Sequence, residues 1–115
     1  MKDLQVIQNQ IAQWSSKTFG NNKERKIGIA NHLIEEAKEV LDAVNKFELS
    51  PANIFHDDEE TLGQMADCMI LLLDLASKFN VSTLDLMKAI CHKMEINEKR
   101  EWEGPDEYGC YHHKG

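Results

Sequence analysis

The chain has 115 residues, which is the size of one domain and leaves no room for a second independent core. Its hydrophobic fraction of 42% is enough for it to fold alone, although small helical proteins often complete their core with a partner subunit. The formal charge of −7 excludes a nucleic-acid polymer as partner, because neutralising a phosphate backbone takes clustered Lys and Arg. An acidic protein can still bind a phosphorylated small molecule when a cation bridges the two.

Apolar residues at helical spacing predict four helices and an all-α fold. The predicted helices cover residues 2–18, 24–48, 58–79 and 82–102. Gly20 and the asparagines after it predict a turn, and Pro51 predicts a loop between the second and third helices. We assign residues 1–103 to one all-α domain. Residues 104–115, which are rich in Gly, Pro and polar groups, are expected to form a C-terminal loop or tail.

The third predicted helix is apolar on nearly every side between residues 65 and 76, so it should be covered all round. Three other helices cannot supply that cover, and we therefore expect a bundle of four to five helices completed by oligomerisation. Asp67 and Asp74 interrupt the apolar run, which is also too short to span a bilayer. The first ten residues lack the pattern of a signal peptide, so we expect a cytoplasmic protein without a membrane partner.

The second predicted helix carries three carboxylates beside its apolar stripe, at Glu35, Glu36 and Glu39. Such residues usually form a solvated face, although neighbours at this spacing repel one another. Asp67, in the most apolar part of the third helix, needs a partner for its charge. One or two divalent cations between these helices would satisfy both. Oxygen ligands favour Mg²⁺, with Mn²⁺ as a substitute, over zinc.

A polar stripe continues the apolar face of the fourth predicted helix as Lys93, Asn97 and Arg100. One interpretation is a solvated helix end whose cations complement the helix dipole. Beside an acidic metal site, the same side chains are suited to bind oligophosphate oxygens and a sugar or base. His32, one turn before Glu35 and Glu36, is either a substrate contact or, as a lone helical histidine more often is, a packing or supporting residue.

Four further features leave alternatives open. Trp14 is either a core residue or a platform on which a nucleobase stacks. Asp74 is expected to be a polar group at a subunit interface. Cys68 and Cys91 are expected to be small buried apolar residues. The C-terminal tail offers weak candidates for metal ligands, namely Cys110, His112 and His113.

At this point the chain resembles the MazG-type all-α nucleoside triphosphate pyrophosphohydrolases, whose signature is Glu-Glu-x-x-Glu on one helix and Glu-x-x-Asp on the next long helix. The stretch "EEAKE" at 35–39 matches the first motif, and "QMAD" at 64–67 matches the second at Asp67 alone. "WSSKTFG", "KMEINEKREW" and "GPDEYG" resemble a subgroup of short phage and bacterial members described as dATP/dGTP diphosphohydrolase-like. The resemblance extends over residues 4–113.

The resemblance implies hydrolysis of a (deoxy)nucleoside triphosphate between its α and β phosphates, with Mg²⁺ required, by a dimer or tetramer whose site lies between neighbouring chains. It assigns metal binding to Glu35, Glu36, Glu39 and Asp67, with Gln64 as a weaker ligand. It assigns contacts with the substrate to Lys93, Asn97 and Arg100. Glu36, and next to it Glu35, are the candidates for the catalytic base.

Gln64 departs from the family motif, because it stands where the motif has a glutamate. An amide oxygen can bind Mg²⁺, but it carries no charge and cannot act as a base. Weaker metal binding and a lower rate are expected, unless Glu60, one turn earlier, compensates. Two other classes of function therefore stay open: a nucleotide-binding or regulatory protein without turnover, and a structural oligomer without a ligand.

Overall fold

The computed structural model describes residues 3–49 and 59–115, and this part of the chain contains four helices. They are α1 (Leu4–Phe19), α2 (Arg25–Glu48), α3 (Glu59–Lys78) and α4 (Thr83–Lys99). The predicted all-α class is confirmed, and the described helix ends lie within three residues of the predicted ones. The predicted loop at 49–58 and the start of the third helix at residue 58 lie outside the described residues, except for Leu49.

Local sequence accounts for the ends of α1 and α3. The Asp3 carboxylate accepts a hydrogen bond from the Val6 amide at 2.9 Å, which caps the start of α1. α1 ends at Gly20, whose φ of 79° favours glycine, and the Gly20 N–H donates to the Ser16 carbonyl. Asn80, with φ of 59°, ends α3 in the left-handed region.

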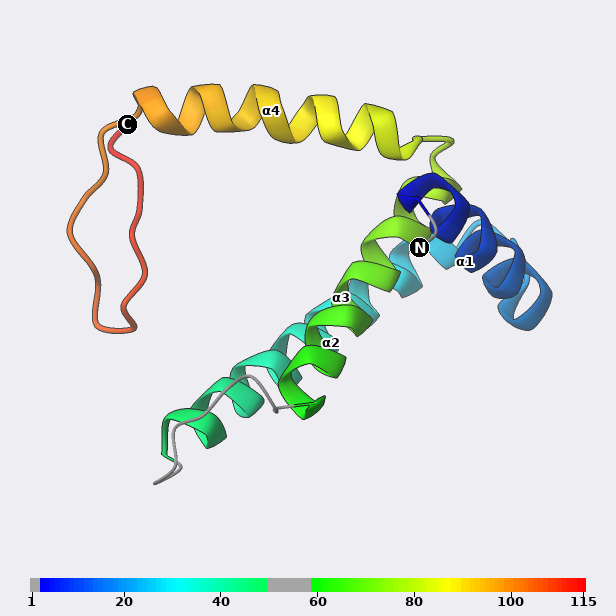
Figure 1. The fold of residues 1–115 in the computed structure, drawn as a ribbon, viewed down its shortest axis with the longest axis horizontal. Coiled ribbons are helices and arrows are strands. Elements are labelled where there is room, and N and C mark those ends of the chain that lie inside the picture. Colours follow the sequence, from blue (N-terminus) through cyan, green and yellow to red (C-terminus); the bar gives the residue numbers. More distant parts are fainter. Residues whose placement is uncertain (1–2, 50–58) are drawn as a thin grey trace. The chain divides into compact units, whose positions relative to one another are not determined.

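The chain divides into two compact units, Met1–Thr83 and Leu84–Gly115. In the first unit α2 and α3 lie side by side, and α1 packs on α3 (Figure 1). The second unit contains α4 beyond its first residue and the C-terminal segment. The predicted functional boundary between residues 103 and 104 stays a prediction. None of the described helices is long and apolar enough to cross a membrane.

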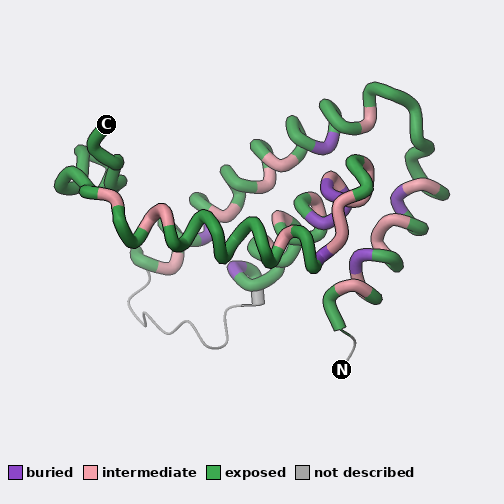
Figure 2. The backbone as a smooth tube through the Cα atoms, turned by 90° about the horizontal axis from the view of Figure 1, so that it is seen from above, coloured by how far each residue is buried: buried purple, intermediate pink, exposed green. Residues whose placement is uncertain are grey.

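Among the described residues, the interior of the first unit contains slightly more polar than apolar residues. Its buried apolar residues are Ile29, Ala43, Leu73 and Ala76, and its buried polar residues are Gln8, Ser15, Thr61, Asp74 and Thr83. Buried positions are scattered along the helices in Figure 2, apart from Leu73, Asp74 and Ala76, which lie close together on α3. Hydrogen bonds therefore carry much of the packing. For example, the Gln8 side-chain amide donates to the carbonyls of Leu73 and Val81 at 3.2 and 2.9 Å.

Asp74 is the centre of the contact between α1 and α3. Ser15 Oγ donates to Asp74 Oδ2 at 2.6 Å, while Arg25 and Lys78 place cationic nitrogens 3.8 and 3.7 Å from its two carboxylate oxygens. The expectation that Asp74 lies at a subunit interface is therefore wrong: its partners are within the chain, and a buried carboxylate needs them.

Large apolar side chains remain uncovered on α3 and α4. On α3, Met65, Met69, Ile70 and Leu72 are between 37% and 50% exposed. On α4, Leu84, Met87, Ile90 and Met94 are between 48% and 60% exposed. Within the first unit, the described helices α1 and α2 thus do not supply the cover that the composition of the third helix requires. Cys91 is exposed and Cys68 half-buried, so the burial expected of Cys91 is also wrong.

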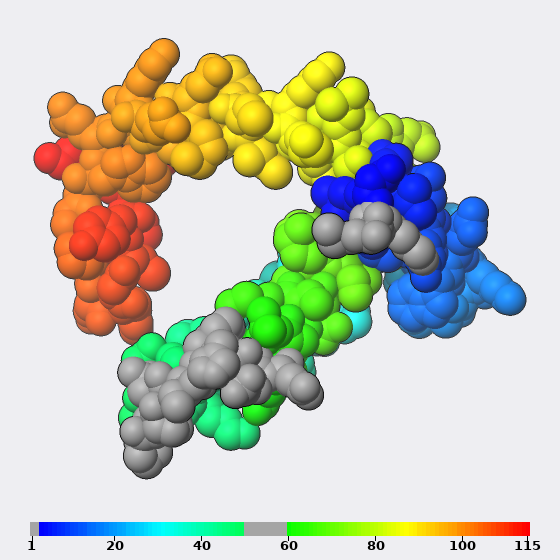
Figure 3. Space-filling model, in the orientation of Figure 1, coloured from blue at the N-terminus to red at the C-terminus, as the bar shows by residue number. Residues whose placement is uncertain are grey.

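The C-terminal segment is a closed loop held by its own hydrogen bonds. The amide of Glu103 donates to the His112 carbonyl at 2.7 Å, and Trp102 pairs with His113 in an isolated antiparallel bridge. Asp106 accepts from the amides of Tyr108 and Cys110 and contacts His112 at 2.9 Å. The His112 contact, together with these amides, lowers the pKa of Asp106. Side chains fill the space within the loop (Figure 3).

Candidate active site

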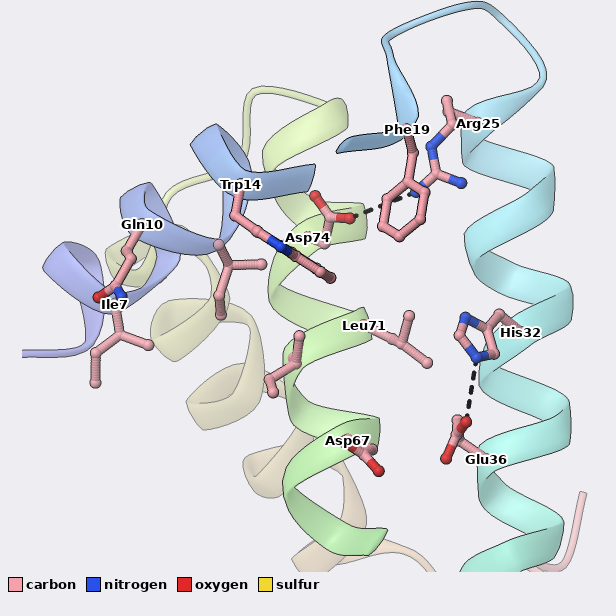
Figure 4. Close-up of a pocket in the computed structure, with 12 residues that line it drawn as sticks. Ile7, Gln10, Trp14, Phe19, Arg25, His32, Glu36, Asp67, Leu71 and Asp74 are labelled. Carbon is pink, nitrogen blue, oxygen red and sulfur yellow. Dashed lines mark hydrogen bonds and ion pairs between the residues drawn. The ribbon is translucent and has the colours of Figure 1, made fainter. Parts of the chain in front are cut away.

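A cavity of about 590 Å³ opens in the first unit and is lined by residues of α1, α2 and α3 (Figure 4). At one end it presents the predicted site residues His32, Glu36 and Asp67. At the other end it presents Trp14, Phe19 and Arg25 beside the buried Asp74. Apolar side chains such as Leu71 line the space between the two ends. The cavity is therefore polar at both ends and apolar in the middle.

One carboxylate oxygen of Glu36 contacts a neighbouring side chain, and the other has no partner among the described residues. Its Oε1 lies 3.1 Å from His32 Nε2, one turn earlier on α2. Its Oε2 is buried and has no hydrogen-bond partner. A buried carboxylate oxygen without a partner is costly, so this atom is suited to a cation or a donor that the described residues do not supply. His32 thus supports Glu36, in agreement with one of its two predicted roles.

Gln64 presents a second unused acceptor. Its Oε1 is also buried without a hydrogen-bond partner. Gln64 lies on α3 one turn before Asp67, so the two side chains share a face of that helix. Asp67 itself is exposed, so the expectation of a carboxylate buried among apolar residues is wrong, and its side chain instead lines the cavity.

The carboxylates of α2 and α3 influence one another electrostatically. The charge of Glu36 is the main cause that raises the pKa of Glu39 above its usual 4.5, and the close approach of the two carboxyl groups, desolvation and the charge of Asp67 act in the same direction. Burial first, and then the charges of Glu36, Asp67 and Glu39, raise the pKa of the Cys68 thiol. Negative charge is therefore concentrated where α2 packs against α3.

Glu35 and Glu60 contribute less to this site. Glu35 is exposed and does not line the cavity. Glu60, which was expected to compensate for Gln64, pairs with Lys46 Nζ at 3.1 Å and is also exposed. Of the three α2 glutamates, Glu36 is thus the one that reaches the cavity.

The donor set fits a hard divalent cation that is shared with a ligand. Among residues 3–49 and 59–115, no three His, Cys, Asp or Glu side chains converge into a complete metal centre. Two unused oxygens on adjacent helices, Glu36 Oε2 and Gln64 Oε1, are nevertheless the type of ligand that Mg²⁺ prefers. Mg²⁺ commonly takes one or two carboxylates and completes its coordination with water and substrate phosphates. The side chains present therefore fit Mg²⁺ or Mn²⁺ better than zinc.

The predicted phosphate-binding residues lie on or just after α4, in the second unit. Lys93 is exposed, and Arg100 Nη1 donates to the side chain of Asn97 at 3.3 Å. Asn97 and Arg100 thus share a face of the helix end, as their spacing predicts. Their contact with substrate phosphates stays a prediction. In the tail, His112 pairs with Asp106 and His113 packs edge-on against Trp102, which leaves Cys110 without a partner ligand for metal.

Phe19, Arg25 and Asp74, at the end of the cavity opposite the carboxylates, were not predicted from the sequence as site residues. Arg25 is the first residue of α2 and Phe19 the last of α1, so both border the turn between these helices. The stretch "WSSKTFG" contained a signal for this end of the cavity, because it includes Trp14, Ser15 and Phe19. Trp14 is 53% exposed and lines the cavity, which excludes a core role.

Comparison with known proteins gives two matches. The model of the dATP/dGTP pyrophosphohydrolase family matches residues 7–113. A protein of Salmonella phage PMBT28 named "dATP/dGTP diphosphohydrolase" is 30% identical over 97 residues, which cover 84% of this chain and 27% of that protein. The chain therefore spans about a quarter of the length of this curated relative. No solved structure matches the chain.

Replacing Gln64 by glutamate is expected to strengthen metal binding, because it adds a negative charge on α3 one turn before Asp67. In a thermal melt without metal, Gln64→Glu should be less stable than the unaltered chain, since it increases repulsion. Saturating Mg²⁺ should stabilise it more, by about 1.4 kcal/mol for each tenfold gain in affinity. Gln13→Glu makes the same change at an exposed position outside the cavity. Equal Mg²⁺-induced shifts for all three proteins would contradict the site.

Proposed function

Because this chain belongs to the dATP/dGTP pyrophosphohydrolase family, we propose that it hydrolyses dATP and dGTP between the α and β phosphates in a Mg²⁺-dependent reaction. The products are the deoxynucleoside monophosphate and pyrophosphate. The observation that best supports this proposal is the pair of buried oxygens, Glu36 Oε2 on α2 and Gln64 Oε1 on α3, that have no hydrogen-bond partner among the described residues. Two acceptors without donors in a negative environment call for a cation, and a triphosphate brings one with it.

Glu36, Glu39, Asp67 and Gln64 would hold the metal in this mechanism. When bound, Mg²⁺ neutralises phosphate charge and polarises the bond that breaks. The carboxylates of the chain fix the position of the triphosphate at the acidic end of the cavity. Positioning and charge stabilisation supply most of the rate in phosphoryl chemistry, so a small helical scaffold is sufficient.

Glu36 is the better candidate for the general base. One of its oxygens is oriented by His32, the other has no partner among the described residues, and the side chain lines the cavity. Water adds to one phosphorus of the anhydride, the bond between that phosphorus and the bridging oxygen breaks, and one proton passes to a carboxylate. Glu35, the second candidate, is exposed and outside the cavity lining, so it is less suited to receive that proton.

We further propose that the working enzyme is a dimer or tetramer. The support is the exposed apolar surface of α3 and α4, which exceeds what scattered surface residues require. Burial of these side chains against a second copy would stabilise the chain by about 25 cal/mol for each Å² removed from water. Lys93, Asn97 and Arg100 would then contact the phosphates as the family pattern implies.

Gln64 supports a second candidate, a nucleotide-binding protein with little or no turnover on the same scaffold. An uncharged amide in place of the motif glutamate weakens the negative environment that attracts the metal. Nucleotide would bind in the same cavity under this alternative, and no product would appear.

Pyrophosphate release measured with Mg²⁺ and each of the four dNTPs and four NTPs tests the enzyme. We expect dATP and dGTP to be hydrolysed, and Glu36→Gln to lower kcat by about 100-fold or more, the usual contribution of a general base. Glu48→Gln removes the same charge from an exposed position at the end of the same helix and should retain activity. Saturable nucleotide binding without pyrophosphate would favour the binding protein, and hydrolysis that survives Glu36→Gln would contradict the mechanism.

Sedimentation velocity over a range of chain concentrations tests the assembly. We expect a species of twice or four times the chain mass, because the apolar faces of α3 and α4 would otherwise stay in water. A single species with the mass of one chain at every concentration would contradict the oligomer.

A further inference from the structure

The end of the cavity opposite the carboxylates is built from two aromatic rings and one guanidinium. Trp14 and Phe19 meet edge to face, with ring centroids 5.3 Å apart and planes at 87°. The guanidinium carbon of Arg25 lies 4.9 Å above the centre of the Phe19 ring. Both aromatic side chains are about half exposed, and all three residues line the cavity (Figure 4). This end therefore offers a flat apolar surface beside hydrogen-bond donors.

The guanidinium of Arg25 is held in place by contacts that use only some of its N–H donors. Its contacts with Ser15 Oγ at 3.5 Å and Asp74 Oδ2 at 3.8 Å both use Nη2. Its Nε is buried and has no hydrogen-bond partner among residues 3–49 and 59–115. A guanidinium carries five N–H donors in a fixed plane, so contacts through one nitrogen leave most of them unused. Asp74, which is buried and also pairs with Lys78, thus holds the Arg25 guanidinium in place while leaving some of its N–H donors unused.

The distance between the two ends suits one nucleotide. Asp67 and Asp74 both line the cavity and lie two turns apart on α3, which corresponds to about 10 Å along the helix axis. A triphosphate held at Glu36 and Asp67 would extend its sugar and base along the apolar middle of the cavity. The base would then reach the end that is formed by Trp14, Phe19 and Arg25.

Stacking alone cannot choose between bases, because every base has a π face and stacking tolerates any sequence. Adenine and guanine differ at position 6, where one has an amino group and the other a carbonyl. They share the N7 acceptor, which pyrimidines lack, and arginine is a common donor to that atom. A site for both purines needs a donor at N7 rather than a group that reads position 6.

We infer that Arg25 donates a hydrogen bond to N7 of the purine base while the base packs against Trp14, and that Arg25 thereby selects purine over pyrimidine nucleotides. This inference rests on the proposed function for the position of the triphosphate. It adds the residue that reads the base. Arg25 is neither part of the acidic motifs nor part of the stripe on α4.

The test compares dGTP with 7-deaza-dGTP, and dATP with 7-deaza-dATP, in which a C–H group replaces N7. In the unaltered chain we expect kcat/KM to fall by about 10- to 100-fold for each 7-deaza nucleotide, as for loss of a hydrogen bond to a charged group. Arg25→Met should lower kcat/KM for dATP and dGTP. In this variant each natural nucleotide and its 7-deaza analogue should have the same kcat/KM. Lys78→Met removes the other cation beside Asp74, outside the cavity lining, and should keep the full 7-deaza penalty.

A binding measurement gives the same answer without turnover. The chain has two tryptophans, so Trp102→Phe leaves Trp14 as the single fluorescent reporter. Titration with dGTP, 7-deaza-dGTP or dTTP should quench this fluorescence, and dGTP should bind at least about tenfold more tightly than its 7-deaza analogue. Tripolyphosphate, which has no base, should bind without quenching. The contrast also shows whether Trp14 meets the base.

Equal kcat/KM or Kd for natural and 7-deaza purines in the unaltered chain would overturn the inference, even if dATP and dGTP are hydrolysed. If the 7-deaza nucleotides still react more slowly than the natural ones in Arg25→Met, another group donates to N7, and that result would also overturn the inference. If Arg25→Met does not fold, Arg25→Lys keeps a cation beside Asp74 and should reduce the penalty at least about threefold, since a single ammonium group cannot serve both Asp74 and N7. An unchanged penalty in that variant, or no binding of any purine nucleotide, counts against Arg25.

Discussion

The arrangement of the first unit depends on one electrostatic constraint, the concentration of carboxylates where α2 packs on α3. Glu36 raises the pKa of Glu39, and Asp67 adds to that effect from the neighbouring helix. His32 contacts one oxygen of Glu36, while the other oxygen and the Gln64 carbonyl are buried without partners. Packing the apolar stripes of two helices brings these groups together at a cost in stability. A divalent cation carried by a triphosphate would offset that cost, and the cavity beside the carboxylates has room for the nucleotide.

At the opposite end of the cavity, the charge of a buried carboxylate is compensated by side chains of the chain itself. Asp74 is also a buried carboxylate, but Ser15, Arg25 and Lys78 satisfy it within the chain. Asp74, whose charge is compensated within the chain, therefore stabilises the contact between α1 and α3. The charges of Glu36, Glu39 and Asp67 lack such compensation, and a bound cation would supply it. Both ends share a small interior, which contains about as many polar as apolar buried residues among those described. The exposed apolar side chains of α3 and α4 are consistent with a core that a second copy completes.

Helices were predictable because apolar periodicity and local turn residues are properties of short segments: Gly20 ends α1 as predicted. Glu36 and Asp67 were predictable as site residues because two short motifs lie on long helices. The sequence could not predict that one side-chain oxygen of Glu36 and one of Gln64 are buried without a hydrogen-bond partner among the described residues, because their burial follows from how the helices pack. Arg25 and Asp74 were missed for the same reason, because 49 positions separate them along the chain. Asp67 was placed correctly in the site but wrongly in a buried environment, because helical periodicity does not show that a cavity opens beside it.

The most direct test of a cation between α2 and α3 is a titration of Mn²⁺ followed by electron paramagnetic resonance, with α,β-methylene-dGTP present so that no hydrolysis occurs. The unaltered chain, Glu36→Gln, Asp67→Asn and the double variant form a complete cycle. The account predicts that each single substitution weakens Mn²⁺ binding by at least about tenfold, or about 1.4 kcal/mol. It also predicts that the double variant loses less than the sum of the two, because both residues would hold the same ion. Mn²⁺ affinity that is unchanged by either substitution would contradict the account.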